Sequence, residues 1–236
     1  MQTAVQICKE HMPQGIMFLG SNLDHFRNHT NETHVPCLLV TTGASALNFP
    51  ELSSIAVDDS AAAAQVIEHF ISCGHKNIGI IGGDPAISRP SFLRMTGCRA
   101  AFDRNGLAFD TAKQYAYARF SLKGGYLATK ELLQKFPEMT AIFAISDLMA
   151  LGAYRALNES GLRIPEDISV VGFDGIELSK YVVPKLATIR QNADKLAERS
   201  VDIMLRMIRG ECGAVHEVIP FEVIAGESVR TIRQEE

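Results

Sequence analysis

An aspartate and an arginine carry the clearest chemistry in this sequence. Asp174 ends the apolar stretch ISVVGFD (168–174), and Arg94 lies in SFLRMTGCRAAF (91–102). A carboxylate at the end of a buried strand can accept two hydroxyl groups through charge-assisted hydrogen bonds, although it could also cap the following turn. The planar guanidinium group suits hydroxyl, carboxylate or phosphate groups, and its alternative role is a surface ion pair. The two residue types indicate recognition of a small polar molecule.

An aromatic ring and two helix-capping residues extend this candidate set. Phe120 follows the strand-like QYAYA (114–118), and its flat ring could cover the C–H face of a sugar or a base. An ordinary core phenylalanine explains the same position equally well. Ser146 and Asp147 precede a helical pattern, so their first expected role is the N-cap.

Other chemical patterns are weaker. His25, His29 and His34 have spacings that could meet a metal ion, but they lie on an expected peripheral helix and loop without a second shell of carboxylates in evidence, and we expect no metal site. Asp58 and Asp59 would point to opposite faces of a continued strand. No nucleophile elbow, zinc-protease motif or dinucleotide or phosphate loop is present, so we expect neither an enzyme nor a cofactor.

Composition limits the class of protein. The 236 residues are 47% hydrophobic and 21% charged, which allows one large domain or two small ones. The sequence lacks both an apolar run of about 18 residues and a secretory signal at its start, so we expect a cytoplasmic protein without a membrane contact. The net charge of −4, with dispersed basic residues, argues against a nucleic-acid surface on these residues. The five scattered cysteines fit reduced thiols.

Strand and helix patterns alternate along nearly the whole chain, which is typical of an α/β fold with doubly wound parallel sheets. The predicted strands are 15–20, 35–42, 54–59, 77–83, 114–118, 140–146, 168–174 and 186–191. HEVIPFEVIAG (216–226) alternates more and should lie at a sheet edge. The predicted helices are 61–73, 91–105, 122–136, 147–160 and 192–209, and residues 1–12 look like the tail of another.

Four stretches form a specific combined pattern. They are GHKNIGIIGG (74–83), RMTGCRAAF (94–102), ISDLMALGAYRALNESGLRIPEDISVVGFDG (145–175) and PKLATIRQ (184–191). In these stretches the chain resembles the effector-binding domain of the LacI/GalR family of transcriptional regulators. The resemblance implies a periplasmic-binding-protein-like fold, in which two α/β subdomains are joined by a hinge and hold a ligand in the cleft. It maps the first subdomain to 1–73 plus 190–214 and the second to 74–189 plus 215–236.

The resemblance also assigns roles and an absence. The family's helix-turn-helix headpiece and first βαβ unit have no counterpart here, so the first subdomain is expected to be incomplete and the chain to be a fragment of a longer protein. By position in the family pattern, the ligand-binding residues are Asp174, Arg94, Phe120, Ser146, Asp147, Ser88, Phe173 and Ser21. Ser21 would be the contribution of the first subdomain.

The function implied is allosteric sensing. A small polar effector, expected to be a sugar or sugar derivative, would bind between the lobes, and a homodimer would relay this to operator DNA through a headpiece outside this chain. The alternative is the solute-binding protein of a sugar transporter, which should carry a signal peptide. An enzyme on the same scaffold is a third possibility. The sequence leaves the identity of the effector open.

Overall fold

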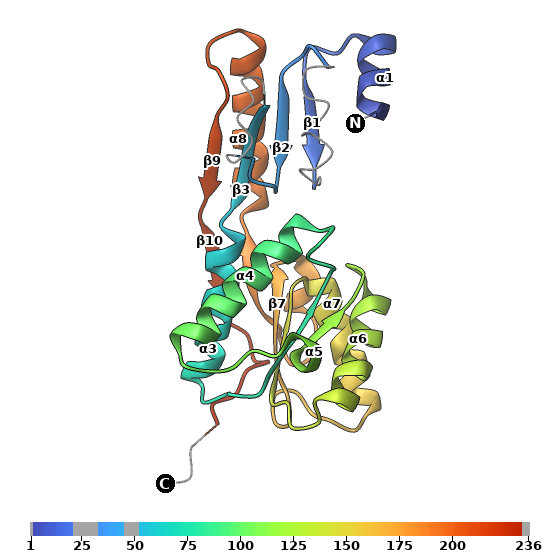
Figure 1. Cartoon of the computed structure of the whole chain (residues 1–236), viewed down its shortest axis with the longest axis vertical. Coiled ribbons are helices and arrows are strands. Elements are labelled where there is room, and N and C mark those ends of the chain that lie inside the picture. The colour runs from blue at the N-terminus through green and yellow to red at the C-terminus, as the bar shows by residue number, and fades with distance from the viewer. Residues whose placement is uncertain (1, 21–32, 45–51, 233–236) are drawn as a thin grey trace. The chain divides into compact units, whose positions relative to one another are not determined.

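The chain forms two compact units, which are described separately. The structure, a computed structural model, describes residues 2–20, 33–44 and 52–232. The first unit is 1–58 with 192–220, and the second is 59–191 with 221–236. The chain therefore passes from one unit to the other after Asp58, after Gln191 and after Pro220 (Figure 1).

The first unit is built on a four-stranded parallel sheet with strand order β1-β2-β3-β9. Among its described residues, the strands are β1 (Ile16–Leu19), β2 (Cys37–Val40), β3 (Leu52–Val57) and β9 (His216–Ile219), and the helices are α1 (Gln2–His11) and α8 (Ala193–Ile208). β2 and β3 are buried along their whole length, as strands of a parallel sheet covered by other elements require. On α8, Leu196, Ile203 and Met204 form a core with Leu38 and Ile55 of the sheet.

The second unit has a six-stranded sheet with strand order β10-β8-β7-β6-β4-β5, in which only β10 is antiparallel to its neighbour. Its strands are β4 (Ile78–Gly82), β5 (Tyr115–Tyr117), β6 (Ala141–Ala144), β7 (Ser169–Asp174), β8 (Ala187–Gln191) and β10 (Phe221–Ile224). Its helices are α3 (Asp59–Ser72), α4 (Arg89–Arg104), α5 (Thr111–Gln114), α6 (Leu122–Lys135), α7 (Asp147–Glu159) and the 3-10 helix η2 (Glu177–Lys180).

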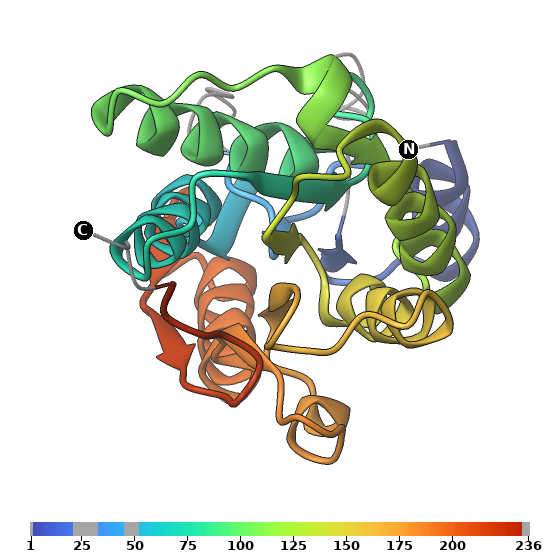
Figure 2. The ribbon, with the colours of Figure 1, turned by 90° about the horizontal axis from the view of Figure 1, so that it is seen from below.

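Helices cover both faces of this second sheet. α3 packs on α4, and α6 packs on α7, as Figure 2 shows from below. In β7, Phe173 lies under Arg94 of α4, whereas Gly172 abuts Asp147 of α7. Because successive strand residues point to opposite faces, the two helix pairs cover opposite faces of the sheet. The doubly wound α/β fold expected from the sequence is confirmed.

The stretch 216–226 illustrates a limit of the strand predictions. It lies at a sheet edge, as expected, but it forms two strands in two different sheets. Pro220 separates β9 from β10, and a proline cannot donate a hydrogen bond to a strand ladder. The prediction of a single strand was therefore wrong, while the prediction of an edge position is confirmed.

The unit boundaries also differ from the expected ones. The sequence divided the chain near residues 73, 189 and 214, but the compact units divide after Asp58, Gln191 and Pro220. The helix α3 therefore belongs to the second unit. It packs so closely on α4 that a Cβ atom at Gly97 would collide with the backbone carbonyl of Ser60. A periodic pattern predicts a helix without indicating which sheet it covers.

Candidate ligand-binding site

Asp174 ends β7 in an unusual backbone conformation. Its φ angle is 121°, and Gly175 follows with φ 73°. Positive φ angles favour glycine, and a non-glycine residue there costs about 1–3 kcal/mol. A Cβ atom at Gly175 would lie 2.6 Å from the Cβ of Arg190 on β8. The chain thus makes a sharp, constrained turn directly after the carboxylate.

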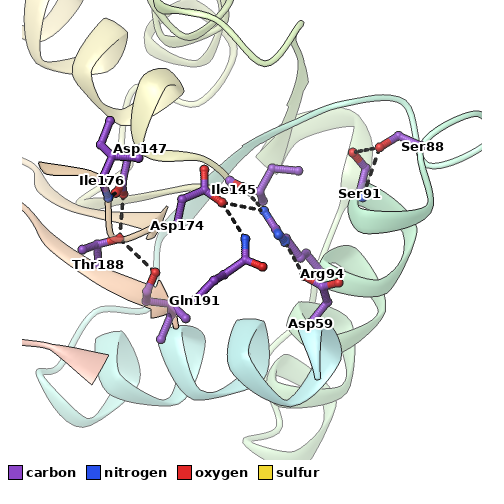
Figure 3. A network of polar contacts seen from close by, with 11 residues as sticks. Asp59, Ser88, Ser91, Arg94, Ile145, Asp147, Asp174, Ile176, Thr188 and Gln191 are labelled. Atoms are coloured by element: carbon purple, nitrogen blue, oxygen red, sulfur yellow. Dashed lines mark hydrogen bonds and ion pairs between the residues drawn. The ribbon is translucent and has the colours of Figure 1, made fainter. Parts of the chain in front are cut away.

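Several donors surround the Asp174 carboxylate (Figure 3). Nε2 of Gln191 donates to its Oδ1 at 2.8 Å, and Nη1 of Arg94 lies 4.0 Å from the same oxygen. Burial raises the pKa of Asp174, while Arg94 and hydrogen bonds from Gln191 and Ser146 oppose the rise. The side chain nevertheless stays 31% exposed, so a ligand can reach it.

Arg94 is held rigidly inside the second unit. Its side chain is 5% exposed, and its Nε donates to Oδ1 of Asp59 at 2.8 Å. Nη1 donates to the carbonyl of Ile145, and the guanidinium lies over the Phe173 ring at 3.5 Å from the centroid. A cation desolvated in this way interacts favourably with an aromatic face. Arg94 therefore forms a buried ion pair rather than the surface pair that the sequence left open.

Asp59 and Gln191 are contacts that sequence reasoning missed. The sequence placed Asp58 and Asp59 on a continued strand, but β3 ends at Val57 and Asp59 begins α3, 3% exposed and facing Arg94. An acidic residue in the first turn of a helix is a common signal and could have suggested this. Gln191 ends β8, the parallel neighbour of β7, so the shared sheet edge places it beside Asp174.

Ser146 and Asp147 lie at the start of α7 and have different hydrogen-bond partners. Ser146 occupies the N-cap, but its hydroxyl makes no capping bond and hydrogen-bonds Asp174 instead. Asp147 is fully buried and accepts hydrogen bonds from Thr188 Oγ1 (2.6 Å) and the backbone N–H of Ile176 (2.8 Å). Burial raises the pKa of Asp147 to about 6. Ser146 therefore contacts Asp174, whereas the Asp147 side chain is buried against Thr188 and Ile176.

Ser88 and Phe120 belong to a second group beside α4. Ser88 caps this helix, and Ser91 Oγ donates to Ser88 Oγ at 2.8 Å. A Cβ atom at Gly83 would lie 2.7 Å from Ser91 Oγ and 3.0 Å from the Phe120 ring, so both groups flank this glycine. Phe120 is 42% exposed, which excludes the core-phenylalanine alternative.

The remaining predicted residues have other placements. Phe173 is fully buried beneath Arg94, so it supports the guanidinium and presents no surface to a ligand in this structure. This corrects its expected contact role, because the alternation of β7 turns its ring toward α4. Ser21, His25 and His29 lie outside the described residues.

Other features of the described residues lie away from this cluster. Across 2–20, 33–44 and 52–232, no group of three potential metal ligands converges. A cavity of about 350 Å³ in the second unit lies between α3, β8 and β10, and its walls include Val66, His69 and Val223. None of the predicted ligand-binding residues lines it. Within the same described part of the chain, no helix is long and apolar enough to cross a membrane.

Comparisons with known proteins agree with this architecture. Residues 67–229 match the family model described as periplasmic binding protein-like domain. The chain is 31% identical over 231 residues to the HTH-type transcriptional regulator MalR of Clostridium butyricum, covering 96% of this chain and 68% of that protein. Other regulators are matched over about half of their own length or less.

Solved structures give the same result. The complex of the transcriptional regulator CelR with cellobiose has a TM-score of 0.83 and 27% identity, covering 96% of this chain and 69% of that one. The lac repressor dimer bound to operator and an anti-inducer has a TM-score of 0.84 and 28% identity, covering 97% of this chain and 78% of that one.

Proposed function

Because this chain belongs to the LacI/GalR family of transcriptional regulators, we propose that it is the ligand-sensing core of such a regulator. It binds a small polar effector, a sugar or sugar derivative, and this binding controls the attachment of the whole protein to operator DNA. The DNA is contacted by a helix-turn-helix segment outside these residues. A regulator of this kind acts in the cytoplasm.

The observation that carries the proposal is the exposed Asp174 carboxylate among buried, fixed partners. Arg94, Asp59 and Ser146 are almost fully buried, while Asp174 keeps an accessible face. A preorganised carboxylate accepts hydroxyl groups without first having to be ordered, which favours a polyol ligand over water. Phe120, half-exposed in the group beside α4, supplies an apolar face for the C–H side of a sugar ring.

A sugar is supported by chemistry and by similarity. The similar CelR structure contains cellobiose. Arg94 is already paired with Asp59, so the charge that remains at the site is that of Asp174. A neutral, hydroxyl-rich molecule suits such a site better than an anion.

We also infer that two copies of the chain assemble through an exposed apolar segment of the second unit. Leu178, Tyr181 and Val183 lie within six residues, and Val183 is 92% exposed. Clustered exposed apolar side chains mark association surfaces. The similar lac repressor was solved as a dimer on its operator, which supports this assembly. Closure between the two units, which the chain links at three points, is the proposed signal from effector to dimer.

The alternative of a transporter's solute-binding protein is not favoured, because the relatives matched here are transcriptional regulators. Turnover of a bound sugar would favour an enzyme instead. We propose binding without turnover, since Arg94, Asp59 and Asp174 hold one another by hydrogen bonds and charge rather than activating a nucleophile.

Calorimetric titration with cellobiose, maltose and D-ribose tests the sugar class. We expect at least one of them to bind the parent, and Asp174→Asn to weaken that binding at least tenfold because the charge-assisted bonds are lost. Arg99→Ala, an exposed arginine on the same helix, is the matched control and should bind like the parent. Equal affinity of Asp174→Asn and the parent would remove Asp174 from the site.

A further inference from the structure

Asp147 has a place in the second unit that the ligand-contact role does not explain. We propose that it is a positioning residue, which in its ionised form clamps the turn after Asp174 to α7 and β8 and thereby makes effector binding depend on pH. This inference rests on the proposed function only for its effect on effector binding. The clamp itself consists of contacts within the chain and does not require a bound ligand.

The first step is the geometry of the carboxylate (Figure 3). Its Oδ2 accepts the backbone N–H of Ile176 at 2.8 Å, and its Oδ1 accepts the Thr188 hydroxyl at 2.6 Å. Asp147 is the first residue of α7, Ile176 follows the turn after β7, and Thr188 belongs to β8. One side chain therefore joins three elements.

The second step is the fit of β7 against this side chain. A Cβ atom at Gly172 would collide with Oδ1 of Asp147, so the strand passes directly against the carboxylate. Glycine at this position leaves the space that the carboxylate fills. The backbone of β7 and the side chain of Asp147 thus fit each other closely, two residues before Asp174.

The third step connects the clamp to Asp174. Asp174 and Gly175 have positive φ angles of 121° and 73°. The N–H groups of Gly175 and Ile176 both bond the Asp147 carboxylate, and the N–H of Asp147 bonds Asp174 in return. Because positive φ is unfavourable for a non-glycine residue, an external restraint must hold this turn. The reciprocal bonds of Asp147 provide that restraint.

The fourth step is the chemistry of protonation. The partners of the Asp147 oxygens, backbone N–H groups and a hydroxyl, all act as donors, so the ionised form, which only accepts, satisfies them. A protonated Asp147 has one donor of its own. The Thr188 hydroxyl oxygen can then accept a hydrogen bond from the protonated carboxyl group. To do so, the hydroxyl turns its own proton toward the Ile189 carbonyl, which lies 3.3 Å away. Protonation consequently replaces the charge-assisted bonds with weaker neutral ones.

Two titratable groups interact with Asp147. Asp174 at the end of β7 raises the pKa of Asp147 by its charge, and Tyr154, further along α7, senses the charge of Asp147 in turn. The Thr188 and turn contacts are uncharged. Burial is the largest influence and raises the pKa of Asp147 to about 6. The clamp therefore changes its protonation state at mildly acidic pH.

The clamp can be tested without an effector by NMR of the full 236-residue chain labelled with [15N]isoleucine. We expect the Ile176 amide to titrate with a midpoint near pH 6, and this titration to vanish in Asp147→Asn. Asp167→Asn is the matched control, because Asp167 is a surface acid bonded to Arg163, and it should leave the Ile176 titration unchanged. An Ile176 amide that does not titrate between pH 5 and pH 7 in the parent overturns the proposal.

Substitutions at Thr188 keep the test valid if Asp147→Asn does not fold. Thr188→Val removes a hydrogen bond that lowers the pKa of Asp147, so the Ile176 midpoint should rise. Thr188→Ser keeps the hydroxyl and should restore the parental midpoint. Identical midpoints in Thr188→Val and the parent would contradict the clamp.

The effect on binding is measured with the same three sugars, by calorimetry at pH 5 and pH 7. For any sugar that binds, Asp147→Asn should bind about tenfold more weakly than the parent at pH 7, as loss of one such hydrogen bond implies. The difference between parent and variant should shrink at pH 5. If the amide titrates as expected and none of the sugars binds, the clamp is supported and the proposed sugar class fails. A difference that persists at pH 5 overturns the regulatory part.

Discussion

Two arginine–aspartate pairs in the second unit have the same chemistry and different surroundings. Arg94 and Asp59 are 5% and 3% exposed, and one nitrogen–oxygen contact of 2.8 Å joins them. Arg163 and Asp167 are 70% and 31% exposed, and two side-chain contacts of 3.0 and 3.1 Å and a backbone N–H contact of 2.8 Å join them. In the surface pair, both carboxylate oxygens of Asp167 accept a hydrogen bond from the guanidinium. The buried pair has additional partners, the Ile145 carbonyl and the Phe173 ring.

The difference shows why the buried pair is the one that can organise a site. Water competes for exposed charges, and such pairs contribute little to stability. A buried charge must keep all of its partners, because an uncompensated charge in the interior is very unfavourable. Arg94 is therefore fixed beside Asp174, whereas Arg163 and Asp167 stabilise a local turn.

The largest expected effect comes from breaking the buried pair. Asp59→Ala leaves the Arg94 guanidinium without its ion-pair partner and should lower the free energy of unfolding by about 3–5 kcal/mol. Urea denaturation followed by circular dichroism measures this loss. A double variant, Asp59→Leu with Arg94→Met, should recover much of it, because neither member of the pair is then left as an unpaired buried charge. A loss as small as that of an exposed pair would show that water reaches Arg94.

The next effect concerns Asp147, a buried carboxylate held by uncharged donors. The pKa of Asp147 is raised from 3.8 to about 6, so between these values the folded chain holds a proton that the unfolded chain has lost. Its contribution to stability is present below about pH 4 and declines by about 3 kcal/mol as pH rises through 6. Urea midpoints of the parent and Asp147→Asn at pH 4 to 8 measure the difference. A difference that does not change with pH would contradict the raised pKa.

A smaller loss is expected when the fit around Asp147 is disturbed. Gly172→Ala places a methyl group against Oδ1 of Asp147, and such overpacking costs about 1–3 kcal/mol. Gly213→Ala is a matched control, since a Cβ atom there meets nothing within 4 Å. Thermal unfolding of both variants compares them. Equal melting temperatures would mean that β7 has room beside α7.

The smallest effect belongs to the exposed pair. Arg163→Ala should leave the urea midpoint at pH 7 nearly unchanged, because both side chains are solvated and salt screens them. The Arg163 guanidinium holds the pKa of Asp167 at about 2, so its contribution is present above pH 4 and is lost as pH falls through 2. A clear loss at pH 7 would remove the contrast with Arg94 and Asp59.

The sequence predicted the scaffold better than the site. The alternation of apolar strands and periodic helices is local, and every predicted strand core is present in the structure. The position of Asp174 at the end of a buried parallel strand was predicted and is confirmed, and its ligand-binding role stays a prediction from the ligand-binding edge of such sheets. The family pattern added Arg94, Ser146 and Phe120, and the structure brings Arg94 and Ser146 to Asp174.

Tertiary structure decided the partners. Asp59 and Arg94 are separated by 35 residues, and no local pattern states that α3 and α4 pack together with these side chains facing. The same holds for Asp147 and Thr188, which are 41 residues apart. Likewise, no local pattern states that α3 belongs to the second unit. Periodicity reports which face of an element is buried, whereas the identity of the neighbour depends on long-range packing. The sequence by itself determined the strands, the helices and the edge at which Asp174 lies, and the folded chain determined which charges are paired there.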